Sequence, residues 1–140
     1  NFKYITPPSF YEHEEFLKRF EDLQKEVMDI QREGLSLGIP AEDVRFALTN
    51  ATETRFVVTT NARQLRHMFN LRCCQRAQWE IREMFTTLLN EYKKIAPNIF
   101  YNAGASCDEF GYCPEGKMSC GRSPTLDELK KAYKDSKKLK

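Results

Sequence analysis

The sequence has 140 residues, enough for one domain with a buried core, and its 41% hydrophobic and 12% aromatic content is that of an ordinary globular protein. Its formal net charge of +2 gives no strong field, so charge does not indicate a nucleic-acid partner. No apolar run approaches the roughly 20 residues of a membrane span, and residues 1–4 do not resemble a signal peptide. We therefore expect a cytoplasmic protein with no membrane partner.

The N-terminal part predicts one long amphipathic helix. Residues 2–6 alternate apolar and polar side chains, a weak strand signal that Pro7 and Pro8 end. Ser9 and Glu12 have the spacing of a capping box, which would start the helix. Apolar side chains then recur every three or four residues and predict a stripe that belongs to the core or to a subunit interface: Phe16, Phe20, Leu23, Val27 and Ile30.

A short helix and a strand are predicted next. Pro40 can occupy the first turn of a helix that reaches about Ala47. Residues 54–60 contain three consecutive β-branched or aromatic side chains between polar ones, which predicts a short buried strand. At its end Asn61 can accept a hydrogen bond from a free backbone N–H, so we expect it to be the N-cap of the next helix.

The helix that follows Asn61 combines an apolar side with many cationic groups. Its apolar residues are Leu65, Met68, Phe69 and Leu71. Its other polar residues are Arg63, Arg66, His67, Arg72 and Arg76. A helix N-terminus surrounded by arginines suits a phosphate or another anion. The alternative is that these arginines only solvate the outer face of the helix.

A second long helix and a cysteine-containing loop complete this part of the chain. The helix is predicted from an apolar face that Pro97 closes: Ala77, Ile81, Met84, Leu88, Tyr92 and Ile95. Residues 98–122 are rich in Gly, Asn and Ser and contain Cys107, Cys113 and Cys120. These thiols could bind zinc or form a disulfide, but a structural zinc site needs four ligands and no histidine lies nearby. The odd number of cysteines, five, favours free thiols and no metal.

Residues 123–140 predict a last helix and a basic tail. Ser123 can be its N-cap and Pro124 its first residue, while Asp127 and Glu128 lie near the positive end of the helix dipole. A lysine-rich, solvated end follows, and we predict no nucleic-acid role for it.

Several separate pieces of the sequence resemble the C-terminal part of the flavin-dependent thymidylate synthases. Their order and spacing over about residues 42–83 make the resemblance specific. One departure is Thr49, where the family usually has proline. The matching pieces are Asp43-Val44-Arg45, Thr54-Arg55-Phe56, Thr60-Asn61-Ala62-Arg63, Leu71-Arg72 and Ala77-Gln78-Trp79-Glu80-Ile81.

The resemblance implies a reaction and roles for named residues. Enzymes of this family convert dUMP to dTMP by reductive methylation, with FAD, NADPH and methylenetetrahydrofolate as the carbon donor, and they work as homotetramers whose sites combine several chains. Asn61 and Arg63 would contact the flavin, together with His67. Arg72 would be the catalytic residue that binds and polarises the pyrimidine of dUMP, and Arg45 would bind the same nucleotide. Arg76 stands where the family often has histidine.

The family's other signature, R-H-R-x-x-S, does not occur in this sequence. We therefore predict an α/β (α+β), predominantly helical fold, with long amphipathic helices around a small sheet that a missing N-terminal segment or neighbouring subunits complete. Residues 1–122 would be the C-terminal portion of the catalytic domain, and the isolated chain would be incomplete and inactive. Two alternatives from other classes are a non-enzymatic helical interaction module and a zinc- or thiol-containing loop module.

Overall fold

The computed structural model describes residues 3–138, and they form a predominantly helical protein, as predicted. The chain divides into two compact units, Asn1–Val57 and Val58–Lys140, and each is described by itself below. No helix among the described residues is both long enough and apolar enough to cross a membrane.

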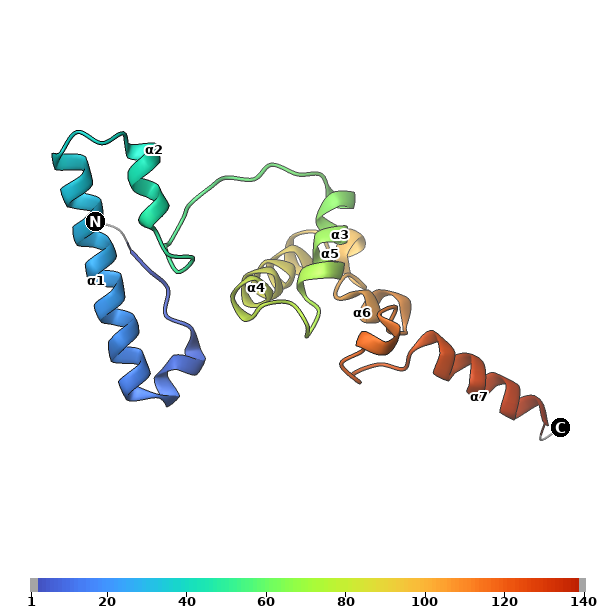
Figure 1. The fold of residues 1–140 in the computed structure, drawn as a ribbon. Coiled ribbons are helices and arrows are strands. Elements are labelled where there is room, and N and C mark those ends of the chain that lie inside the picture. Colours follow the sequence, from blue (N-terminus) through green and yellow to red (C-terminus); the bar gives the residue numbers. More distant parts are fainter. Residues whose placement is uncertain (1–2, 139–140) are drawn as a thin grey trace. The chain divides into compact units, whose positions relative to one another are not determined.

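Unit 1 is built on the predicted long helix. Helix α1 covers Glu14–Ser36, and the short helix α2 (Ala41–Val44) runs directly into the 3-10 turn η2 (Arg45–Ala47), which confirms the short helix predicted after Pro40. Helices α1 and α2 lie side by side (Figure 1). A Cβ atom added to Gly34 would lie 2.9 Å from a methyl group of Val44, so this close approach requires glycine.

The buried face of α1 contains Val27 of the predicted stripe but otherwise differs from that stripe. Phe16, Leu23 and Ile30 are exposed, whereas Gln24 and Gln31 are only 3% and 2% exposed. The physical reason is hydrogen bonding across the unit, because buried polar groups need partners. Oε1 of Gln24 accepts from the Thr49 hydroxyl at 2.8 Å, and Gln31 donates to the backbone carbonyl of Val44.

The predicted capping box of Ser9 and Glu12 is wrong. Residues Pro8–Glu12 form a separate 3-10 turn, η1, and α1 starts at Glu14 without a side-chain cap. Packing fixes this turn, because the Phe10 ring meets those of Phe16 and Phe20 edge-on, with centroids 4.9 and 5.0 Å apart.

The sheet is reduced to isolated pairings in the described residues. Tyr4 and Thr52 form one antiparallel bridge. Phe2, the first residue of the strand predicted at residues 2–6, lies outside the described residues. The strand predicted at residues 54–60 is not formed, since this extended segment pairs with nothing in residues 3–138. Its apolar side chains are exposed rather than buried, and Val57 is 97% exposed. A strand needs a partner edge, and the described residues offer none to this segment.

Unit 2 contains the core that positions the candidate site. Its elements are α3 (Ala62–Arg72), α4 (Trp79–Ile95), α5 (Pro97–Phe100), α6 (Ser106–Phe110), η3 (Gly116–Met118) and α7 (Leu126–Lys138). Helices α3 and α4 pack together, and α5 and α6 complete the cluster (Figure 1). Phe69 lies at its centre, 0% exposed, with the rings of Phe85 and Phe100 edge-on at 6.1 and 5.9 Å.

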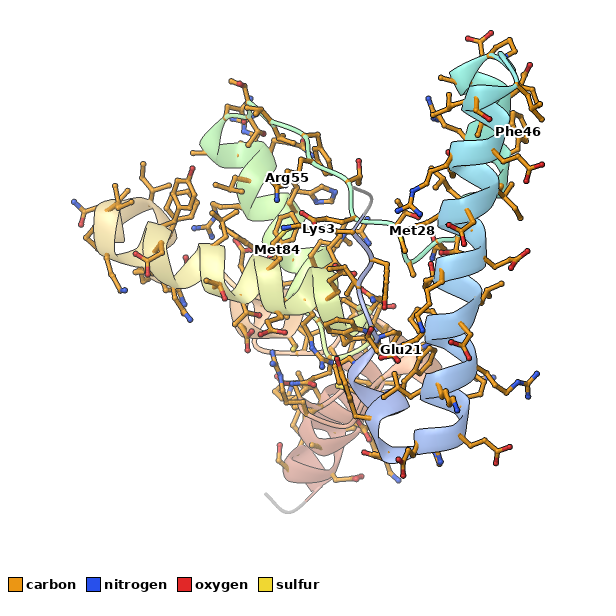
Figure 2. The ribbon with its side chains drawn as sticks, turned by 90° about the vertical axis from the view of Figure 1, so that its left-hand side faces the viewer. Lys3, Glu21, Met28, Phe46, Arg55 and Met84 are labelled. Atoms are coloured by element: carbon orange, nitrogen blue, oxygen red, sulfur yellow. The ribbon has the colours of Figure 1, made fainter. Side chains whose placement is uncertain are left out.

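The second long helix ends before Pro97, as predicted, but its buried face is rotated. Phe85 and Leu89 are buried, with Ile81 and Tyr92 packed partly against the same cluster. Met84, labelled in Figure 2, is exposed, together with Leu88 and Ile95. Phe85 fills the space beside Phe69, so the packing of aromatic rings decides which face of α4 is buried.

Helix α7 is capped by Thr125 rather than by Ser123. The Thr125 hydroxyl accepts from the Glu128 N–H at 3.3 Å, and the Glu128 carboxylate accepts from the Thr125 N–H at 2.7 Å. The predicted cap is wrong because the carbonyl of Pro124 is already bonded to the N–H of Cys113, at 2.7 Å, and holds this residue outside the helix.

The cap of α7 should respond to pH. Hydrogen bonds from Thr125 lower the pKa of Glu128, so the carboxylate stabilises the helix start at neutral pH. This stabilisation is lost as pH falls below the usual glutamate range and through the lowered pKa of the folded state. We expect the backbone amide NMR signal of Thr125 to report this titration, and Glu128→Gln to remove it. An unchanged titration in Glu128→Gln would assign the response to another group.

Candidate active site on helix α3

Helix α3 begins at the predicted residue. Asn61 has extended backbone geometry, and its side-chain oxygen accepts a hydrogen bond from the N–H of Gln64 at 2.9 Å. The N-cap prediction is therefore confirmed. Asn61 fixes where the helix starts and thereby the position of Arg63 and His67, which follow on the next turns.

The cap of α3 should contribute measurably to stability. We expect Asn61→Ala to lower the free energy of unfolding by about 1 kcal/mol, because one N–H of the first turn loses its partner. Asn61→Asp keeps an acceptor oxygen and should be close to the wild type. Urea unfolding followed by circular dichroism measures both variants. Equal losses in the two variants would show that the cap is not the cause.

Arg63 and His67 line one pocket of about 480 Å³ in unit 2. They are four residues apart, so they share a face of α3. Beside them Arg66 is engaged within the protein: its guanidinium donates to the backbone carbonyl of Ile99, to Asn102 Oδ1 at 3.0 Å and to the Glu109 carboxylate. Arg66 therefore connects α3 to α5 and α6 and does not remain free for a ligand.

Two residues that line the same pocket carry buried acceptors that lack partners. Asn70 Oδ1 and Glu109 Oε2 have no hydrogen-bond partner among the described residues, and both residues line the pocket. A buried acceptor without a donor is costly. The two acceptors and the cationic Arg63 thus suit a ligand that carries both hydroxyl or N–H donors and an anionic group.

Arg72 lines a different pocket, of about 250 Å³, at the C-terminal end of α3. Two other arginines in this pocket are already bonded within the protein. Arg76 donates to the carbonyl of Met118 at 2.8 Å, and Arg122 donates to Cys107 and Asp108. Arg72 has no hydrogen bond or ion pair from its side chain in residues 3–138, and it is exposed. Its guanidinium is therefore free to bind an anion or a carbonyl oxygen.

Arg45, the remaining predicted site residue, belongs to unit 1. It is the first residue of η2 and is exposed, next to Phe46, whose ring is 90% exposed (Figure 2). Unit 2 brings Asn61, Arg63 and His67 onto the first half of α3 and Arg72 onto its end.

All five cysteines are free in the structure. Burial raises the pKa of the Cys73 thiol, and this residue belongs to the buried core cluster of unit 2. Cys74, Cys107, Cys113 and Cys120 line the pocket that contains Arg72. The hydrogen bond to Cys107 is the main cause that raises the pKa of Arg122. No group of three potential ligands has a geometry for a metal ion among the described residues.

Comparison with known proteins identifies the family of this chain. Residues 1–98 match the family Thy1, described as thymidylate synthase complementing protein. The chain belongs to the Thy1 family. The flavin-dependent thymidylate synthase of Geobacter sulfurreducens is 44% identical over 128 residues, which are 91% of this chain and 55% of the relative. That of Pyrococcus furiosus is 39% identical over 116 residues, which are 80% of this chain and 48% of the relative.

This Thy1 chain spans about half the length of the curated relatives that it matches.

Its sequence predicted the exposed residues of α3 but missed the residues that hydrogen-bond to the arginines of the site. Glu109 and Asn102 lie 43 and 36 residues from Arg66, and Arg122 lies 15 residues from Cys107. No local periodicity links such distant positions. Helix α3 carries several arginines and no acidic residue. This imbalance was the one feature of the sequence that indicated acidic partners from other segments.

Proposed function

We propose that the chain forms part of the active site of a flavin-dependent thymidylate synthase, which converts dUMP to dTMP with methylenetetrahydrofolate as carbon donor and NADPH as reductant, in the cytoplasm. The observation that carries the proposal is the position of Arg72. It ends the helix that Asn61 caps and that bears Arg63 and His67. Among the described residues, it is the arginine of its pocket without an internal partner.

Flavin binding is assigned to the pocket beside Arg63 and His67. FAD carries a diphosphate, ribityl hydroxyls and ring N–H groups. Arg63 supplies positive charge for the diphosphate, and the unpaired oxygens of Asn70 and Glu109 can accept from hydroxyl or N–H donors. When bound, the flavin supplies hydride transfer, while the protein supplies orientation and charge.

Substrate binding is assigned to Arg72, with Arg45 as a second contact to the same nucleotide. A guanidinium fixed near a pyrimidine carbonyl stabilises negative charge as it develops on that oxygen, which is how Arg72 would act as the catalytic residue. Its fork of N–H donors also fits a phosphate or a carbonyl pair, which a lysine would not match.

Assembly with further chains is part of the same proposal. The extended residues 54–60 expose Phe56, Val57 and Val58, and α1 exposes Phe16, Leu23 and Ile30. Large exposed apolar groups of this kind mark interaction surfaces. Residues 54–60 would pair as a strand of a sheet completed outside this chain, and a homotetramer would bury the face of α1.

Ligand titration tests the proposal. We expect the melting temperature of the purified chain to rise with FAD and with dUMP, because a ligand that binds only the folded state stabilises it by about 2.7 kcal/mol at 100 times its Kd. Arg63→Ala and His67→Ala should reduce the response to FAD. Indifference to both nucleotides would overturn the proposal, and a response to zinc alone would favour the thiol-loop alternative.

A further inference from the structure

The cysteine-lined wall of the Arg72 pocket is not explained by nucleotide binding. Four of the five cysteines line this one pocket, together with Arg72, Arg76 and Arg122 and a single acidic side chain, Glu115. The wall is thus rich in thiols and carries an excess of positive charge, which attracts anions.

Cys107 differs from the other thiols by a direct contact with a cation. Nη2 of Arg122 lies 3.0 Å from its Sγ and donates a hydrogen bond to it. The Asp108 carboxylate accepts a hydrogen bond from the same guanidinium and another from the N–H of Ala105, at 3.0 Å. Asp108 therefore holds Arg122 in place. Cys107 is half-buried, which leaves its sulfur reachable from the pocket.

The three other thiols of the pocket are not equally able to move toward Cys107. Cys113 is buried, and its backbone is fixed by the bond to Pro124 and by a bridge to Thr125. Cys74 packs against the core cluster. Cys120 is exposed and makes no backbone hydrogen bond in the described residues, and Gly121 beside it has φ of 81°, a conformation that favours glycine.

Cys120 is also close in sequence to the residue that contacts Cys107. It precedes by two residues the arginine whose guanidinium contacts the Cys107 sulfur. Both cysteines line the same pocket, and a disulfide requires their two Cα atoms to lie within about 7 Å of each other. A rotation of the loop between η3 and α7 is the movement that would bring the two sulfurs together.

We propose that Cys107 and Cys120 form a dithiol–disulfide pair that reacts with anionic low-molecular-weight disulfides, glutathione disulfide being the probe of this class. Cys107 is the attacking thiol, Cys120 is the resolving thiol, and Arg122 is the positioning residue. The inference is independent of the proposed synthase function, because it concerns only the chemistry of the thiols.

The reaction proceeds in two exchange steps. The Cys107 thiolate attacks one sulfur of glutathione disulfide, which forms a mixed disulfide and releases one glutathione thiolate. The Cys120 thiolate then attacks the Cys107 sulfur, which forms the Cys107–Cys120 bond and releases the second glutathione thiolate. Two protein thiols are oxidised and one glutathione disulfide is reduced. The two protons of the protein thiols pass to the glutathione thiolates through the solvent.

The test is exposure of the full 140-residue chain to glutathione disulfide, followed by non-reducing peptide mass analysis. We expect a cross-linked Cys107–Cys120 peptide pair that is lighter by two hydrogen atoms. Cys120→Ser should instead accumulate the glutathione adduct on Cys107. Cys107→Ser should lose the cross-link.

Variants of Arg122 show whether the rate of Cys107 glutathionylation depends on the contact with the guanidinium or only on positive charge. Arg122→Met should slow glutathionylation of Cys107 by about tenfold, the factor that loss of one hydrogen bond to a charged group produces. Arg122→Lys keeps the charge and should recover part of the rate, provided that circular dichroism shows a wild-type fold. Lys94→Met removes one charge from α4, where Lys94 pairs with Glu91, and should leave the rate unchanged.

Three results would overturn the proposal. The first is a cross-link from Cys107 to Cys113 or Cys74 in place of Cys120. The second is a rate at Cys107 that is the same in Arg122→Met and in Lys94→Met. The third is protection of all four pocket thiols by added zinc before any oxidation, which would identify the cluster as a metal site.

Discussion

Replacement of Phe69 by alanine is expected to lower the free energy of unfolding of unit 2 by about 3–5 kcal/mol. Phe69 is the largest side chain with full burial, and its ring meets those of Phe85, Tyr92 and Phe100 at centroid distances of 6.1, 6.4 and 5.9 Å. Truncation removes these contacts and leaves a cavity that the surrounding helices cannot fill.

The size of this loss follows from the role of Phe69 in joining four elements. It is the position on α3 against which α4 and α5 pack, and α6 contributes the neighbouring Cys107. Small proteins are stable by only about 5–15 kcal/mol in total. Phe69→Ala should therefore shift the urea midpoint strongly, and the exposed side chains of α3 should lose their defined positions first.

Phe46→Ala is the matched control. It makes the same chemical change at a ring that is 90% exposed on η2, and surface substitutions of this kind usually stay within about 0.5 kcal/mol. Urea unfolding of both variants gives the comparison. A loss in Phe69→Ala as small as the one expected for Phe46→Ala would mean that the core of unit 2 does not depend on the aromatic cluster.

The features that the sequence predicted correctly are set by neighbours in the chain. The Asn61 cap needs only the N–H of Gln64, three residues away, and the end of α4 needs only Pro97. The long helix of unit 1 follows from its local period. Such features depend on groups within a few residues of each other, so the sequence pattern contains them.

The features that the sequence missed depend on distant partners. Gln24 and Gln31 are buried because Thr49 and Val44 lie beside them, 25 and 13 residues away. The stripe of α1 was predicted from hydrophobicity alone, which cannot register such polar contacts. Residues 54–60 have the composition of a strand, but composition does not supply the partner edge that a strand requires.

The same distinction holds for the candidate site. The arginines of α3 were visible because they follow one another on one helix. The sequence did not show which of these arginines are hydrogen-bonded within the protein and which are free, because Arg66 and Arg76 bond to residues 33 or more positions away. The structure thereby separates arginines that hold the fold from Arg72, and this separation leads to the second large prediction.

Arg72→Ala is expected to weaken dUMP binding by about a hundredfold, because two charge-assisted hydrogen bonds to the nucleotide would be lost. Stability should change little, since the Arg72 side chain has no internal hydrogen bond or ion pair among the described residues. Where turnover is measured, kcat should fall by a further factor of about 10²–10³, the effect of removing one donor from a developing oxyanion.

Two variants make this prediction specific. Arg72→Lys keeps the charge but not the planar fork, so it should recover only part of the affinity. Arg32→Ala removes an arginine from an exposed pair with Asp29, at 2.8 Å on α1, and should leave dUMP affinity unchanged because such surface pairs contribute little. Isothermal titration calorimetry measures all three. If Arg32→Ala weakens binding as much as Arg72→Ala, dUMP responds to overall charge, and Arg72 loses its assigned role.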